Sequence, residues 1–88
     1  MVAFESAVTA PLTAEQAIRS LLTRRGPGKT ICPSEAARLM AGPHGDWRME
    51  MDAIHAAADA LLRAGEIRLS WKGQEMEQRR GPYRIARR

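Results

Sequence analysis

The stretch EIRLSWKGQEMEQRRGPYRI, residues 66–85, decides the fold of this chain. Apolar side chains occupy every second position from 67 to 71 and polar ones lie between them, which is the pattern of a half-buried strand. We expect a turn at 72–74, a polar and charged loop over 75–81, and a return strand that begins at Pro82. The stretch therefore predicts a β-hairpin whose tip projects from the body of the domain.

A helix and a short strand are predicted near the start of the chain. Thr13 and Gln16 have the spacing of a capping box, and Gly26 supplies a stop, so the first helix should cover residues 14–25. The stretch 29–32 contains β-branched residues and predicts one short strand after the helix.

Two further helices should follow that strand. Pro33 suits the first position of a helix over 33–40, which the glycine- and proline-containing stretch 42–45 then ends. Asp46 is a good cap for a third helix, whose apolar stripe continues until Gly65 terminates it. This third helix should contribute the main apolar surface of the core.

The order helix, strand, helix, helix, strand, wing, strand is that of the winged helix, a helix-turn-helix with an attached β-hairpin. We therefore expect a mainly α, α+β domain over 13–88, preceded by a leader over 1–12. A plain three-helix bundle with an accidental hairpin is the alternative. The short strand at 29–32 favours the winged helix, because a bundle without a wing rarely needs it.

Length and composition limit the classes of function. A chain of 88 residues builds one small core, so we expect no self-contained active site and no enzyme. The apolar runs are too short for a membrane span, and the first ten residues lack the features of a secretory signal. The lone Cys32 has no partner for an internal disulfide, so we expect a cytoplasmic protein.

The positive charge is concentrated in the last part of the chain. Residues 1–63 hold seven basic and seven acidic side chains, whereas 64–88 hold seven basic and three acidic ones, so the whole net charge of +4 lies there. This asymmetry suits a surface that faces a polyanion, although solvated arginines also serve solubility alone.

Several short motifs together are similar to a known family. They are RGPGKTICPSEAAR (25–38), DWR (46–48), AGEI (64–67), KG (72–73) and RGP (80–82). In this combination the chain resembles the bacterial domain of unknown function 3253 over residues 14–88. The resemblance implies a winged-helix fold, and it implies no reaction, ligand or catalytic residue.

No metal, cofactor or catalytic site is expected. His44, His55 and Cys32 match no zinc-ligand spacing. Cys32 lies where a helix N-terminus can activate a thiol, but burial as a small apolar residue is favoured. Asp52 and Asp59 flank His55 at helical spacing without a nucleophile nearby. We therefore expect a solvated face with ion pairs from Arg48 to Asp52 and from Asp59 to Arg63.

Binding of nucleic acid, with double-stranded DNA as the expected partner, is the leading functional hypothesis. In a winged helix the third helix enters the major groove and the wing contacts the backbone. The candidate contact residues are Arg48, His55 and Arg63 on the third helix, Lys72, Arg79 and Arg80 in the wing, and Arg84, with Arg87 and Arg88, beyond it. Five or six phosphate contacts would give a slope of log affinity against log salt of about −4.5 to −5.4.

The outward face of the third helix argues against a conventional reader of DNA bases. It carries Glu50, Asp52 and Asp59, where such a helix usually presents arginine, lysine, asparagine or glutamine. Three interpretations remain open: a wing-dominated binder of low sequence specificity, a binder that acts as a homodimer, and a protein-interaction module that uses the hairpin edge or Trp71. We expect the Trp71 ring to pack in the core rather than to stack on a base or a partner.

Overall fold

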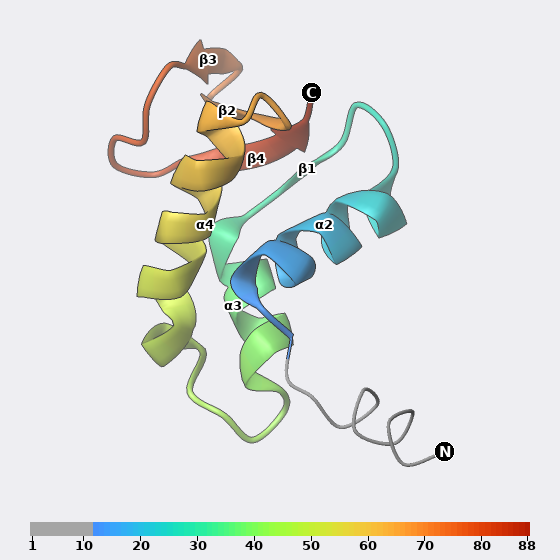
Figure 1. Ribbon diagram of the computed structural model, residues 1–88, viewed down its shortest axis with the longest axis vertical. Coiled ribbons are helices and arrows are strands. Elements are labelled where there is room, and N and C mark those ends of the chain that lie inside the picture. The colour runs from blue at the N-terminus through green and yellow to red at the C-terminus, as the bar shows by residue number, and fades with distance from the viewer. Residues whose placement is uncertain (1–11) are drawn as a thin grey trace.

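The computed structural model of the protein describes residues 12–88 (Figure 1). The predicted leader over 1–12 therefore lies, apart from Leu12, outside the described residues. The elements are, in chain order, α2 (Ala14–Arg25), β1 (Thr30–Ile31), α3 (Pro33–Ala41), the 3₁₀ helix η1 (Trp47–Glu50), α4 (Met51–Arg63), β2 (Ile67–Trp71), β3 (Gln74–Met76) and β4 (Arg84–Arg87).

The first helix begins and ends where the sequence predicts. The Gln16 backbone N–H donates to Thr13 Oγ1 at 3.1 Å, and the Thr13 N–H donates to Gln16 Oε1 at 2.9 Å. This reciprocal capping box satisfies two backbone donors that a helix start leaves free. The helix ends at Gly26, where φ is +89°.

The strand and helices that follow are close to the prediction, with shifted ends. β1 covers only Thr30 and Ile31 instead of 29–32. Pro33 opens α3, and the Glu35 carboxylate accepts from the Cys32 backbone N–H at 2.8 Å. The predicted third helix is divided, because the segment after Asp46 first forms the 3₁₀ helix η1 before α4 begins.

The four strands form one antiparallel sheet in the order β1-β4-β2-β3. The loop predicted over 75–81 is only partly a loop, since β3 pairs with β2 across a two-residue turn. Lys72 and Gly73 both have positive φ, +51° and +82°, as a tight hairpin turn with the twist of the strands requires. The return strand starts at Arg84, two residues later than predicted.

The core lies between the three α-helices and the inner face of the sheet. Ile85 is fully buried and lies in register between Ile31 of β1 and Leu69 of β2. The largest fully buried side chains are those of Ile18, Ile31, Ile54, Ile67, Leu69 and Ile85. In Figure 1 the strands β2, β3 and β4 gather at one end of the molecule, beside the end of α4.

Trp71 departs from the expected packing. Its place in the β2 alternation directs it to the inner face, but 40% of its surface is exposed. The last pair between β2 and β4 joins Ser70 to Arg84. Trp71 therefore lies beyond the end of β4, and within the sheet it pairs only with Gln74 of β3. The prediction of a core tryptophan was wrong, because β4 does not continue alongside Trp71.

The turn between α3 and η1 depends on a close backbone approach at Gly45. A Cβ atom at this position would lie 2.3 Å from the backbone oxygen of Ala41 and 3.0 Å from its carbonyl carbon. Only glycine fits there without a shift of the turn.

The element order and sheet give an α+β domain of winged-helix-like arrangement, as predicted. Within residues 12–88, no helix has the length and apolar character needed to cross a membrane.

Candidate functional site

The outer face of the sheet carries basic side chains. Arg68 pairs with Ala86 and Ser70 pairs with Arg84, and in an antiparallel sheet directly paired residues lie on the same face. Ile67, Leu69 and Ile85 alternate with them and face the core, so Arg68 and Arg84 face away from it. A shallow groove of about 350 Å³ follows this face, and its lining includes Thr30, Arg68 and Ser70. It also includes one acidic residue, Glu75, whose carboxylate accepts from Arg88 at 3.4 Å.

Arg84 is held in place by β1. Its Nε donates to Thr30 Oγ1 at 2.7 Å, and its second guanidinium nitrogen donates to the Thr30 carbonyl at 3.3 Å. Both bonds are to neutral oxygens, so the positive charge of Arg84 is positioned without being neutralised. Within the described residues, Arg68, Lys72, Arg80 and Arg84 all lack an ion-pair partner.

Arg79, a predicted phosphate contact, is instead bound to α4. Its Nε and a terminal guanidinium nitrogen donate to the two carboxylate oxygens of Asp59 at 3.0 and 3.1 Å. The hydrogen bond from Arg79 is the main reason that the pKa of Asp59 lies below its ordinary value. The bidentate pair holds the loop between β3 and β4 beside α4, as Figure 1 also shows.

His55 of α4 also faces the loop between β3 and β4, called the wing loop below. Its Nδ1 forms a 2.7 Å hydrogen bond with the hydroxyl of Tyr83, and the two rings lie 5.7 Å apart. Burial, followed by the nearby Arg79 guanidinium, lowers the pKa of His55. Burial also raises the pKa of Tyr83 to about 12. Both groups are therefore neutral near pH 7, and one ring nitrogen of His55 is engaged in the hydrogen bond with Tyr83.

Acidification is expected to destabilise the fold through His55. Because its folded-state pKa is below the ordinary 6.5, the unfolded chain binds the proton at a higher pH than the folded domain. The contribution to the free energy of unfolding is present above about pH 6.5 and is lost as the pH falls toward the folded-state pKa. The urea midpoint should accordingly drop between about pH 7.5 and about pH 5.5. In His55→Gln this drop should shrink, and an equal drop in the variant would assign it to other groups.

The remaining predicted residues on η1 and α4 do not form the expected helical ion pairs. Arg48 lies 3.9 Å from Asp46, and its guanidinium stands over the Trp47 ring at 4.7 Å from the centroid. Arg38 of α3 stands over the same ring at 4.8 Å. The predicted pairs of Arg48 with Asp52 and of Asp59 with Arg63 are absent from residues 12–88. The Arg48 guanidinium lies over the Trp47 ring instead, and the Asp59 carboxylate binds Arg79. Arg63 is exposed at the end of α4.

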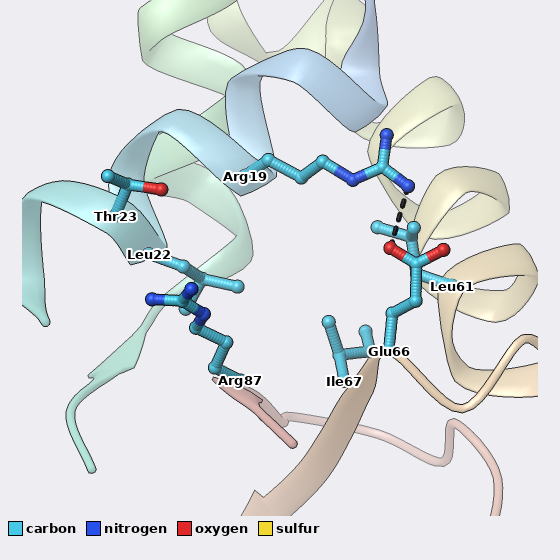
Figure 2. A pocket seen from close by; sticks show the side chains of 7 residues that line it. All are labelled: Arg19, Leu22, Thr23, Leu61, Glu66, Ile67 and Arg87. Atoms are coloured by element: carbon cyan, nitrogen blue, oxygen red, sulfur yellow. Dashed lines mark hydrogen bonds and ion pairs between the residues drawn. The ribbon is translucent and has the colours of Figure 1, made fainter. Parts of the chain in front are cut away.

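A second cleft lies between α2, the end of α4 and the strands β2 and β4 (Figure 2). It has a volume of about 220 Å³, and Leu22, Leu61 and Ile67 supply its apolar part. Arg19 donates to Glu66 at 2.7 Å across one side, which ties α2 to the start of β2. Arg87 borders the opposite side. The pairing of Arg19 with Glu66, 47 positions apart, was not predicted because no local spacing signals it.

Cys32 caps α3 and is partly buried, and its Sγ lies 3.2 Å from Ser34 Oγ. It is therefore not fully covered, contrary to the burial that the sequence favoured. Within the described residues, no three histidine, cysteine, aspartate or glutamate side chains gather in a way that could hold a metal ion.

These features define the class of the protein: a small α+β domain of winged-helix-like arrangement, with a basic outer sheet face and a wing loop bound to its third α-helix. The chain belongs to the family described as "Protein of unknown function (DUF3253)", whose model matches residues 11–88. The resemblance found in the sequence motifs is thereby confirmed, and the family description names no reaction. A comparison with curated proteins found no match.

Proposed function

We propose that this domain is a cytoplasmic, non-catalytic nucleic-acid-binding module that holds backbone phosphates on the outer face of its sheet and on the turn between β2 and β3. The observation that carries the proposal is that the cations of Arg68 and Arg84 on this face and of Lys72 on the turn have no carboxylate partner in residues 12–88. Phosphate contacts of this kind give affinity with little sequence specificity.

Arg84 supports the proposal most directly. Its two bonds to Thr30 fix the side chain before any ligand arrives, and an arginine ordered in advance loses less conformational entropy on binding. Lys72 stands on a two-residue turn whose positive φ values fix the backbone. A phosphate backbone could therefore be held by groups that need little rearrangement.

The outward face of α4 is poorly suited to reading base edges. Asp46 and Glu50 precede it, at the two ends of η1, and Asp52 lies in its first turn; these carboxylates repel phosphate. Farther along, His55 and Asp59 are engaged by Tyr83 and Arg79 of the wing loop. Contacts from Arg48 or Arg63 would have to form beside these groups. For this reason we place the phosphate contacts on the sheet side.

A salt series with a fluorescent oligonucleotide tests the proposal. With three phosphate contacts, the slope of log affinity against log salt should be about −2.1 for a single strand or about −2.7 for B-form DNA. This is less steep than the sequence suggests, because Asp59 and Glu75 pair with Arg79 and Arg88. The double variant Arg68→Ala/Lys72→Ala should reduce the magnitude of the slope by about 1.4 to 1.8 and weaken binding of every sequence.

The matched control is Arg48→Ala/Arg63→Ala, which removes the same charge from the helical side. Its effect on the slope should be clearly smaller than that of the sheet variant. A larger effect of the control would move the interface to α4. Flat anisotropy at low salt with duplex, single-stranded DNA and RNA would refute nucleic-acid binding altogether.

A protein-interaction module is the second candidate function, and exposed apolar side chains favour it. Met49 has 78% of its surface exposed, and Trp71 has 40%. Trp71 also borders an apolar groove lined by Trp47 and Met51, and a continuous apolar surface is typical of interaction sites. This function predicts that both double variants behave alike toward nucleic acid, because neither removes an apolar contact.

A further inference from the structure

An aromatic groove lies where the sheet meets the N-terminus of α3 and the start of α4. It has a volume of about 310 Å³, and Trp47, Met51, Trp71, Pro82 and Tyr83 give it an apolar lining, with Arg84 at its border. The volume is at the lower end of the range for small-ligand sites, which is about 300–1,000 Å³. The groove is therefore large enough to receive a single planar group.

The two tryptophans differ in how much ring surface they offer. Arg38 and Arg48 both stand over the Trp47 ring, at 4.8 and 4.7 Å from its centroid, so its π surface is already in use. Trp71 has no such cation over it within the described residues and is 40% exposed. Trp71 is thus the ring on which a planar ligand can stack.

The charge around the groove specifies the chemistry of the ligand. None of the described residues that line the groove is acidic, and Arg84 is the one arginine or lysine among them. His55 also lines the groove, with its Nδ1 bonded to the Tyr83 hydroxyl. Lys72 follows Trp71 directly, and Arg80 precedes the lining residue Gly81. A planar ring with a negative charge on either side fits this arrangement.

We propose that the groove binds an unpaired nucleobase, which stacks on Trp71 while the flanking phosphates contact Lys72 and Arg84. The inference rests on the nucleic-acid-binding function proposed above and names its preferred substrate, a single strand. A stacked base in a duplex does not expose its ring face, whereas every unpaired base does, so the site should accept single strands with little sequence preference. α4 contributes Met51 and His55 to the lining, and Asp52 follows Met51 directly, so we assign the phosphates to Lys72 and Arg84 rather than to the α4 side.

The test compares a short single strand with an abasic strand of the same length and with the blunt duplex. Wild type should bind the base-containing strand about 5-fold or more tighter than the abasic one, as expected for one aromatic stacking contact. In Trp71→Ala this ratio should fall to about one. Trp71→Phe keeps a ring and should retain part of the ratio. Circular dichroism of both variants checks that they are folded.

Fluorescence gives an independent readout. In a Trp47→Phe background, Trp71 is the sole tryptophan, and its emission should be quenched in a saturable way by the single strand and much less by the duplex. A Trp71→Ala variant that keeps the wild-type ratio, or a wild type that prefers the duplex, would overturn the inference.

The possible failures are distinguishable. Absence of binding to every strand, including the abasic one, would refute the proposed function itself. Binding to the abasic strand and the duplex without a gain from the bases would refute only the stacking site. A stable dimer in sedimentation that Trp71→Ala abolishes would assign the groove to a second copy of the chain and overturn the nucleobase proposal.

Discussion

Ile85→Ala should lower the free energy of unfolding by about 2–5 kcal/mol, the usual range for truncating a fully buried isoleucine. Ile85 has no exposed surface and lies between Ile31 and Leu69 in the central strand. The deletion would leave a cavity where the sheet meets the helices. Because a domain of this size is stable by only about 5–10 kcal/mol, much of its stability would be lost. Urea unfolding followed by circular dichroism measures the change.

Ile85→Val is the matched control, since it removes a single methyl group at the same position. It should cost about 0.5–1.5 kcal/mol, with the same dependence on denaturant as the wild type. A loss below about 1 kcal/mol for the alanine variant would contradict the central position of β4 in the sheet.

Gly45→Ala should destabilise the domain by about 1–3 kcal/mol, although it adds only one methyl group at the surface. The added Cβ would approach the Ala41 backbone oxygen to 2.3 Å, and a backbone atom cannot move away as a flexible side chain can. The turn between α3 and η1 would have to open, which alters the angle at which α4 packs. Thermal unfolding at constant pH measures the effect.

His44→Ala tests whether any change in this turn is harmful. His44 is the exposed neighbour of Gly45 in the same turn, and its truncation should stay within about 0.5 kcal/mol of the wild type. Equal stability of the Gly45 and His44 variants would mean that the turn adapts easily. In that case the close approach of the backbone would have no energetic importance.

The helices were predictable because their ends are fixed by local chemistry. The Thr13–Gln16 capping box and the glycine at position 26 determine α2 with no help from distant residues. The end of the sheet was less predictable. Gln74 and Glu75 are polar, and only Met76 of β3 packs against the core, so it is the pairing with β2 that makes this segment a strand. Pairing between strands is a long-range event that single-strand patterns reveal poorly.

The candidate site was predicted in its residue types more than in its geometry. The alternation from 67 to 71 correctly placed Arg68 and Ser70 on the outer side of β2, because a strand has a strict period of two, but Arg68 was not among the predicted contact residues. It gave no sign that Asp59 would bind Arg79, 20 positions away, or that Tyr83 would engage His55. The exposure of Trp71 also depends on where the neighbouring strand begins, which no local pattern records.

The position of β4 between β1 and β2 has a consequence for how the domain is made. β1 and β2 are not neighbours in the sheet, so a chain synthesised only as far as Gly81 contains β1 and the β2–β3 hairpin without the strand that joins them. Until residues 84–87 leave the exit tunnel, Ile67 and Leu69 have an open strand edge beside them. Nascent chains stalled in this interval would be preferred targets for chaperones and proteases.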